Sequence, residues 1–176
     1  MYILGISCYY HDSAACLIED GKIIAAVEEE RFTRQKHENG FPSQSIDYCL
    51  KEANITSKDI DYVAFHEKPI KKFMRIMQTF TETFPSGFKY FYNTIPEWIN
   101  KKLQVRKEIR ENLDYEGEIL FNSHHLSHSS SAFLVSPFKE AAVLTVDGVG
   151  EITTTQVAHG KGNEIKPLEK IEFPHS

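Results

Sequence analysis

Short apolar runs at the start of the chain predict three β-strands before any helix. The runs cover residues 2–9, 14–19 and 22–28, and each is rich in β-branched and other apolar side chains. Asp20 and Gly21 separate the second run from the third and form a dipeptide typical of a tight hairpin. The pattern therefore indicates two successive antiparallel connections at the amino terminus.

Apolar side chains at helical spacing predict four helices further along. Pro42 and Ser43 begin the first of these, with Ser43 as its expected cap, and Pro85 ends the second. The expected helices cover residues 43–53, 69–84, 96–113 and 122–135, and further strands cover residues 61–65, 117–121, 141–146, 153–159 and 165–172. The aromatic stretch 84–98 is interpreted as core, with a docking face for the missing half of the protein or for a partner as the alternative.

The last three predicted strands look like a restart of the first three. Each set opens with an apolar strand, continues through a short polar turn and ends in a hairpin. Hairpins and helical crossovers together indicate an α/β fold with a mixed sheet. We expect a first subdomain at residues 1–140 and the start of a second, truncated one at residues 141–176, which is the pattern of a piece of a longer protein.

Charge and composition narrow the functional classes. The chain has 176 residues with 20 basic and 25 acidic side chains, its net charge is −5, and its basic residues are scattered, which argues against a nucleic-acid partner. No apolar run reaches the roughly 18 residues that a membrane span needs, so we expect no membrane partner. Cys8, Cys16 and Cys49 include no closely spaced pair, which is typical of a reducing compartment and predicts a cytoplasmic protein.

Two histidines four residues apart form the strongest local signal for a metal site. His124 and His128 follow a predicted strand directly, and on a helix this spacing places both imidazoles on one face. Ligands of open α/β sheets bind at the carboxyl ends of strands, which is where this pair lies. The alternative is a capped helix start with ordinary surface histidines, and His125 is given no ligand role.

A second candidate follows the apolar strand at residues 141–146. Asp147 ends the strand and offers a carboxylate, while Gly148 and Gly150 let the backbone approach and cradle a phosphate. An ordinary hairpin turn is the alternative interpretation. If the two strands are neighbours, His124, His128 and Asp147 converge, and two imidazoles with one carboxylate suit a divalent metal such as Fe²⁺.

A third candidate lies near the amino terminus. His11 and Asp12 occupy the turn between the first two strands, and the charged run at residues 28–36 contains Arg31 and Lys36. This run is too polar for the inside of a strand, so a solvated loop is one interpretation. The functional interpretation is an anion-facing site, in which basic side chains hold phosphate or a carbonyl oxygen.

Four segments together resemble one known family. YYHDSAACL, EEERFTRQKHENGFP, HHLSHSSSAFLVSPF and LTVDGVGE are similar, in this order, to the N-terminal part of carbamoyltransferases, which include nodulation proteins and the enzymes that carbamoylate cephamycin and tobramycin. The resemblance implies an actin-like ATPase fold of two ribonuclease H-like halves. It also implies a separate C-terminal domain that makes carbamoyl-adenylate from ATP and carbamoyl phosphate, and transfer of the carbamoyl group to a small-molecule hydroxyl.

The resemblance also implies roles for individual residues. His124, His128 and Asp147 match the metal site, whereas His11 and Lys36 match residues that contact the carbamoyl or phosphate end and act in catalysis. The residues expected to bind the nucleotide cofactor are Asp12, Arg31, Gly148 and Gly150. Because the remaining ligand and the adenine-binding loops would lie beyond residue 176, we expect no turnover by this chain alone.

Three other functions fit parts of the same pattern. An actin-like or sugar-kinase-like ATPase would share the fold but would leave the histidine pair without a task. A metallohydrolase would use His124, His128 and Asp147 directly on an ester or phosphate. A non-enzymatic binding module would bind neither metal nor nucleotide.

Overall fold

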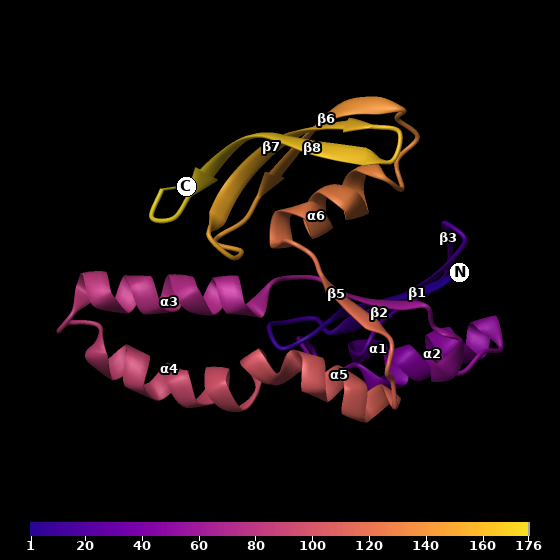
Figure 1. Cartoon of the computed structure of the whole chain (residues 1–176), viewed down its shortest axis with the longest axis horizontal. Coiled ribbons are helices and arrows are strands. Elements are labelled where there is room, and N and C mark those ends of the chain that lie inside the picture. The colour runs from indigo at the N-terminus through magenta and orange to yellow at the C-terminus, as the bar shows by residue number, and fades with distance from the viewer. Residues whose placement is uncertain (176) are drawn as a thin grey trace. The chain divides into compact units, whose positions relative to one another are not determined.

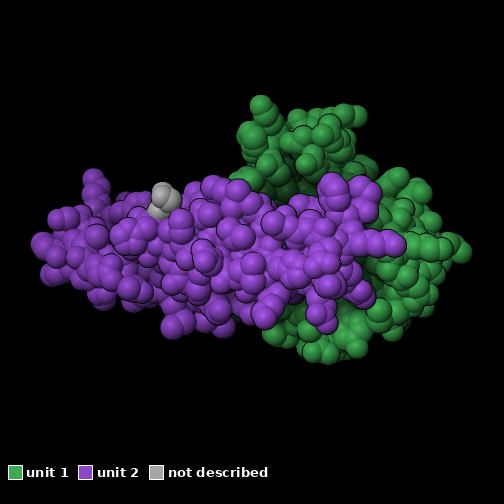
Figure 2. All heavy atoms as spheres, turned by 90° about the horizontal axis from the view of Figure 1, so that it is seen from above, with its two compact units in different colours: residues 1–66, 99–121 green, residues 67–98, 122–176 purple. Residues whose placement is uncertain are grey.

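The computed structural model describes residues 1–175 and divides them into two compact units. Unit 1 comprises Met1–His66 and Ile99–Phe121, and unit 2 comprises Glu67–Trp98 together with the described part of Asn122–Ser176 (Figures 1 and 2). The chain therefore passes between the units three times. The expected boundary between two subdomains after residue 140 stays a prediction.

Unit 1 contains a five-stranded mixed sheet in the order β3-β2-β1-β4-β5. Its strands are β1 Tyr2–Ser7, β2 Ala14–Glu19, β3 Lys22–Glu28, β4 Tyr62–Phe65 and β5 Glu118–Phe121. The first three pair antiparallel, whereas β4 pairs parallel with both β1 and β5. Both predicted antiparallel connections are confirmed, and Asp20 and Gly21 adopt the positive φ angles of 47° and 82° that their turn requires.

Helices pack against this sheet and close the first core. They are α1 Glu30–Thr33, α2 Ser43–Ala53 and α5 Val105–Leu113, with short 3₁₀ turns at Ser57–Asp59 and Lys102–Gln104. Leu4, Leu17, Val63, Ile109 and Cys49 are fully buried among them. Alternate positions along β1 and β2 are buried, as the period of two of a strand requires.

The start of α2 differs from the expectation that Ser43 caps it. The buried carboxylate of Glu29 instead accepts hydrogen bonds from the backbone N–H groups of Gln44 at 3.1 Å and Ser45 at 2.8 Å, and from the Ser45 hydroxyl at 2.7 Å. A carboxylate at a helix amino terminus also interacts favourably with the helix dipole. Glu29, which lies between β3 and α1, thus caps α2, and no local spacing in the sequence indicates it.

We predict that Glu29→Gln lowers the free energy of unfolding by about 1.5–3 kcal/mol, because an amide group replaces the charged acceptor of buried donors. Urea denaturation followed by circular dichroism measures the change. Glu52→Gln, at an exposed position on the same helix, is the matched control and should change stability by less than about 0.5 kcal/mol. Equal stability of the two variants would contradict the capping role of Glu29.

Unit 2 combines a helical pair with an antiparallel sheet. Its elements are α3 Pro69–Thr83, α4 Phe88–Asn100, whose last two residues pass into unit 1, α6 His124–Phe133, β6 Glu140–Val146, β7 Thr153–Lys161 and β8 Glu164–Glu172. The strands form a meander in the order β6-β7-β8, and α6 covers one face through Phe133, Val143 and Ala158 (Figure 1). A Cβ atom on Gly160 would lie 2.7 Å from the Phe133 ring, so this contact requires glycine.

The prediction of one helix over residues 96–113 is wrong. α4 begins at Phe88 and runs through Pro96, and a break at Lys101 separates it from α5. The early start is accompanied by a tertiary contact, because the rings of Phe80 on α3 and Phe91 on α4 stack with centroids 3.9 Å apart. Such a contact between two helices leaves no periodic signal in the sequence.

The aromatic stretch is mostly exposed rather than core. Trp98 is buried and its ring lies 6.0 Å from that of Phe73, but Phe88, Tyr90 and Tyr92 are more than half exposed.

Among residues 1–175, no helix combines the length and the apolar character that crossing a membrane requires.

Candidate functional site

The two candidate histidines lie at the start of α6, on one face of the helix. Ser123, in extended conformation, precedes the helix, and His124 is its first residue. The Nε2 atoms of His124 and His128 are 3.0 Å apart, as the spacing of four residues predicts. His124 is 9% exposed, whereas His128 is open to solvent.

Asp147 completes this cluster from the end of β6. Its Oδ2 atom lies 2.7 Å from Nε2 of His124, and its Oδ1 atom accepts a hydrogen bond from the Gly148 N–H. One ligand atom from each of His124, His128 and Asp147 lies within 4.8 Å of the other two. The structure therefore brings together the three residues that were predicted to share a metal.

The charges of the cluster influence one another. Burial alone would lower the pKa of His124, but the carboxylates of Glu67 and Asp147 outweigh it and raise the pKa above the ordinary 6.5. Burial and the neighbouring His124 lower the pKa of His128. Burial would raise the pKa of Asp147, but His124 and the Gly148 N–H lower it. One imidazole thus favours its protonated form and the other its neutral form.

Glu67 and Lys72 form a buried ion pair beside Nδ1 of His124, and neither residue was predicted from the sequence. Glu67 Oε2 lies 3.4 Å from His124 Nδ1 and accepts a hydrogen bond from Lys72 Nζ at 2.8 Å. Both Glu67 and Lys72 are 7% exposed. A carboxylate beside the second nitrogen of a histidine orients the ring and raises the basicity of the first. The position of Glu67, just after the β4 strand, was the available sequence signal.

Glu151 joins the start of α6 to the segment that precedes α3. Its buried Oε1 atom accepts hydrogen bonds from the backbone N–H groups of Lys68 at 2.7 Å and His124 at 3.2 Å. Beside it, a Cβ atom on Gly150 would come within 2.6 Å of the His124 ring, so the ring requires glycine there. Gly148 is exposed in the same loop. The cradling of a phosphate by Gly148 and Gly150 stays a prediction.

His125 points away from the cluster and anchors α6 to the sheet. Its Nδ1 atom lies 2.7 Å from the Thr145 hydroxyl on β6, and its Nε2 atom lies 2.9 Å from the Thr153 carbonyl oxygen on β7. The ring is buried. It therefore holds the helix that carries His124 and His128 in its place on the meander.

The amino-terminal candidates belong to unit 1, where two of them, His11 and Asp12, form a small polar cluster with His37. Asp12 is contacted by Nδ1 of His11 at 2.7 Å and by Nδ1 of His37 at 3.0 Å, and hydrogen bonds from these two rings lower its pKa. His37 was not among the predicted site residues, although it lies in the HENG segment. The structure thus brings His11 and Asp12 together.

The two basic candidates of unit 1 do not join that cluster. Arg31, on α1, donates to Glu28 at 3.2 Å and lies 3.7 Å from a Glu30 oxygen. Lys36 is exposed in the loop that follows α1. Their proposed contacts with phosphate or a carbonyl oxygen stay predictions.

We predict that Asp147→Asn lowers the pKa of His124 in the metal-free protein, because one of the carboxylates that raises it is removed. An NMR titration of the imidazole resonances measures this pKa. Glu164→Gln, an exposed substitution on β8, is the control. A His124 titration that does not move in Asp147→Asn would contradict the ion pair.

The sign of the linked stability follows from the raised pKa of His124. The folded protein holds this proton more tightly than the unfolded chain, so the contribution is fully present below the unfolded value of 6.5. It is lost as the pH rises through the folded pKa. The metal-free Asp147→Asn variant should therefore lose more stability, relative to wild type, in mildly acidic than in alkaline buffer.

Comparison with known proteins places the whole chain in one family model. Residues 2–176 match the model described as carbamoyltransferase N-terminus. The chain is 49% identical to protein sll1178 of Synechocystis over 99% of its own length and 30% of that protein. It is 39% identical to nodulation protein NolNO of Sinorhizobium fredii over 96% of its length and 24% of that protein. The chain thus spans less than a third of either relative.

Solved structures of low sequence identity share the fold. YeaZ from Pseudomonas aeruginosa matches 98% of this chain with 67% of its own, at a TM-score of 0.51 and 12% identity. That protein has an actin-like ATPase fold. The predicted α/β, ribonuclease H-like fold of the actin-like ATPase type is therefore confirmed.

Proposed function

Because this chain belongs to the carbamoyltransferase family, we propose that the whole protein transfers a carbamoyl group to the hydroxyl of a small molecule. The observation that supports the proposal best is the convergence of His124, His128 and Asp147, with ligand atoms within 4.8 Å of one another. A plain nucleotide hydrolase of the same fold would have no use for this cluster.

The proposed donor is carbamoyl-adenylate, made from carbamoyl phosphate and ATP elsewhere in the longer protein. The chain covers only 30% and 24% of the two relatives described above, which leaves room for a second catalytic domain. The chain by itself is accordingly proposed to be inactive. Its task would be to hold the donor and the acceptor for the transfer step.

The cluster on α6 and β6 fits a divalent metal, with Fe²⁺ as the proposed ion. Two neutral imidazole nitrogens and one carboxylate leave coordination positions open, a donor set that divalent iron accepts. Glu67 beside Nδ1 of His124 supplies the oriented second contact that metal-bound histidines usually have. When bound, such an ion supplies Lewis acidity toward a carbonyl oxygen.

The residues of unit 1 are proposed to act on the carbamoyl group. His11 would accept the proton of the acceptor hydroxyl, with Asp12 fixing its ring through the 2.7 Å contact. The acceptor oxygen would then bond to the carbamoyl carbon, while the bond from this carbon to the phosphate oxygen breaks and AMP leaves. Lys36 would stabilise the negative charge that develops on the carbonyl oxygen. Asp12, Arg31, Gly148 and Gly150 would contact the nucleotide.

We predict that the chain binds Fe²⁺ saturably under anaerobic conditions and that His128→Ala weakens this binding about 100-fold or more, because one ligand is lost. Isothermal titration calorimetry measures both affinities. His159→Ala is the matched control, since this histidine lies in the same unit, paired with Glu140 at 2.8 Å. Equal affinity in all three proteins would refute the proposed metal site.

The pH dependence of this binding is a second test of the same site. A metal ligand must be deprotonated, and the pKa of His124 is raised. We therefore predict weaker Fe²⁺ binding at pH values below about 6.5 than above it, and release of protons on binding. Titrations in buffers of different ionisation enthalpy measure the proton release, and binding without it would contradict the assignment of His124.

In a protein of the full length of the relatives, His128→Ala should lower carbamoyl transfer about 100-fold or more while leaving carbamoyl-adenylate formation unchanged. Acceptor carbamoylation and pyrophosphate release measure the two steps separately. Equal loss of both steps would contradict the division of labour. Hydrolysis of simple esters or phosphates by the metal-loaded chain alone would favour the metallohydrolase instead.

A further inference from the structure

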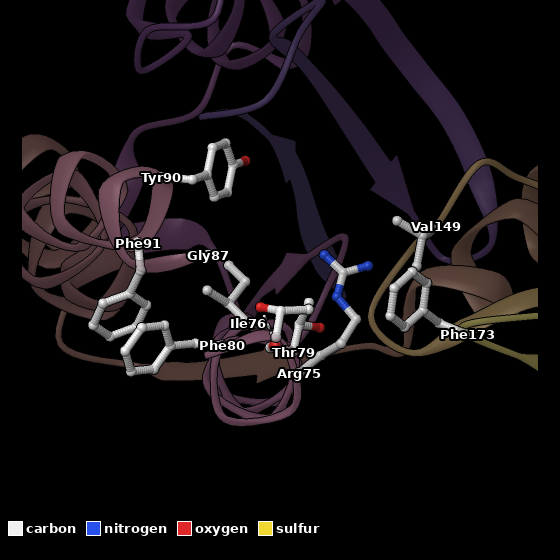
Figure 3. A pocket seen from close by; sticks show the side chains of 10 residues that line it. Arg75, Ile76, Thr79, Phe80, Gly87, Tyr90, Phe91, Val149 and Phe173 are labelled. Atoms are coloured by element: carbon white, nitrogen blue, oxygen red, sulfur yellow. Dashed lines mark hydrogen bonds between the residues drawn. The ribbon is translucent and has the colours of Figure 1, made fainter. Parts of the chain in front are cut away.

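A mostly apolar cavity lies within unit 2, beside α3 (Figure 3). Its volume is about 210 Å³, and Phe80 and Phe91 stack along one side of it. Ile76 and Tyr90 add apolar surface, and Val149 closes the cavity from the loop that follows Asp147. Drug-sized ligands occupy roughly 300–1,000 Å³, so this cavity has room for one moiety of a larger molecule.

Three polar side chains interrupt the apolar lining. The hydroxyls of Thr79 and Thr83 lie one helical turn apart on α3, and Arg75 lies one turn before Thr79. The Arg75 guanidinium carbon is 5.8 Å from the centre of the Phe173 ring, toward which Figure 3 shows the side chain extending. An apolar interior with a few polar groups at one edge is typical of small-molecule sites.

Two of the segments that line the cavity, α3 and the loop after β6, also carry residues of the histidine cluster or of its supporting ion pair. Lys72, which pairs with Glu67 behind His124, lies three residues before Arg75 on the same helix. At 1.5 Å per residue, Arg75 is roughly 5 Å and Thr83 roughly 16 Å further along the helix axis than Lys72. Val149 lines the cavity and lies between Asp147 and Gly150, whose Cβ position is 2.6 Å from the His124 ring. The side of the cavity formed by Arg75 and Val149 is therefore the side nearest to the cluster along both segments.

From these shared segments we infer that the cavity binds the apolar part of the carbamoyl acceptor, so that the acceptor is an amphipathic alcohol with an alkyl or aromatic group. The inference rests on the proposed carbamoyl transfer. The stacked rings and Ile76 receive the apolar part, and Thr79 and Arg75 hydrogen-bond its polar substituents. The Thr83 hydroxyl donates to the Thr79 carbonyl oxygen at 2.8 Å, so toward a ligand it acts as an acceptor. The reacting hydroxyl lies at the end nearest Asp147.

Octyl β-D-glucoside below its micelle concentration is the probe for this cavity, with methyl β-D-glucoside as the probe without an apolar chain. NMR shifts of the Thr79, Gly87 and Val149 backbone amides report binding. We expect saturable shifts with the octyl compound only. Thr79→Trp and Thr83→Phe, which each fill the cavity, should weaken binding about tenfold or more. Met74→Trp, at a 63% exposed position on α3, is the matched control and should bind as wild type.

Three results would overturn the inference. The first is the absence of shifts in wild type, and the second is equal binding by the filled variants and the control, provided that their circular dichroism matches wild type. The third is binding by this chain but not by the full-length protein, because a segment of the protein itself would then occupy the cavity.

The Fe²⁺ titration keeps this test separate from the proposed function. Iron binding without glucoside binding would refute only the proposed acceptor pocket. Glucoside binding without iron binding would keep the cavity as a ligand site but would refute the proposed metal site and its transfer chemistry.

Discussion

The imidazole of His124 is the point on which unit 2 depends, because four separate segments meet there. Its Nε2 atom faces Asp147 from the end of β6, and its Nδ1 atom faces Glu67 from the segment before α3. Its backbone N–H donates to Glu151, whose carboxylate also receives the N–H of Lys68. The ring packs so closely against Gly150 that a side chain there would collide with it. Moving this residue therefore disturbs a helix, a strand end and two loops together.

Burial makes this arrangement specific as well as costly. Glu67, Lys72 and Glu151 are each 7% exposed, and removing ionised groups from water costs several kcal/mol each before pairing offsets it. Such groups tolerate few alternative geometries, because a misplaced partner leaves a charge uncompensated. The network thus orients two imidazoles and one carboxylate toward one point, as a metal site requires. It also connects this point, through α3, to the cavity that we assign to the acceptor.

Several local features could be predicted from sequence because their causes are local. The β1–β2–β3 meander follows from alternating apolar positions and from the Asp20 and Gly21 turn, and the His124 and His128 pairing follows from helical geometry alone. Where a distant residue supplies the cause, the prediction was incomplete or wrong. Glu29 rather than Ser43 caps α2, and the stack of Phe80 on Phe91 accompanies the early start of α4.

The sequence by itself determined the order of the strands, the fold class and the three residues of the candidate cluster, His124, His128 and Asp147. Periodicity, turn chemistry and motif spacing are properties of neighbouring residues, so they can be read along the chain. Only the tertiary structure decided that Glu67, Lys72 and Glu151 support His124, since they lie 57, 52 and 27 positions from it. Contacts over such separations depend on how helices and strands pack, and a side chain's neighbours in space leave no regular pattern in the sequence.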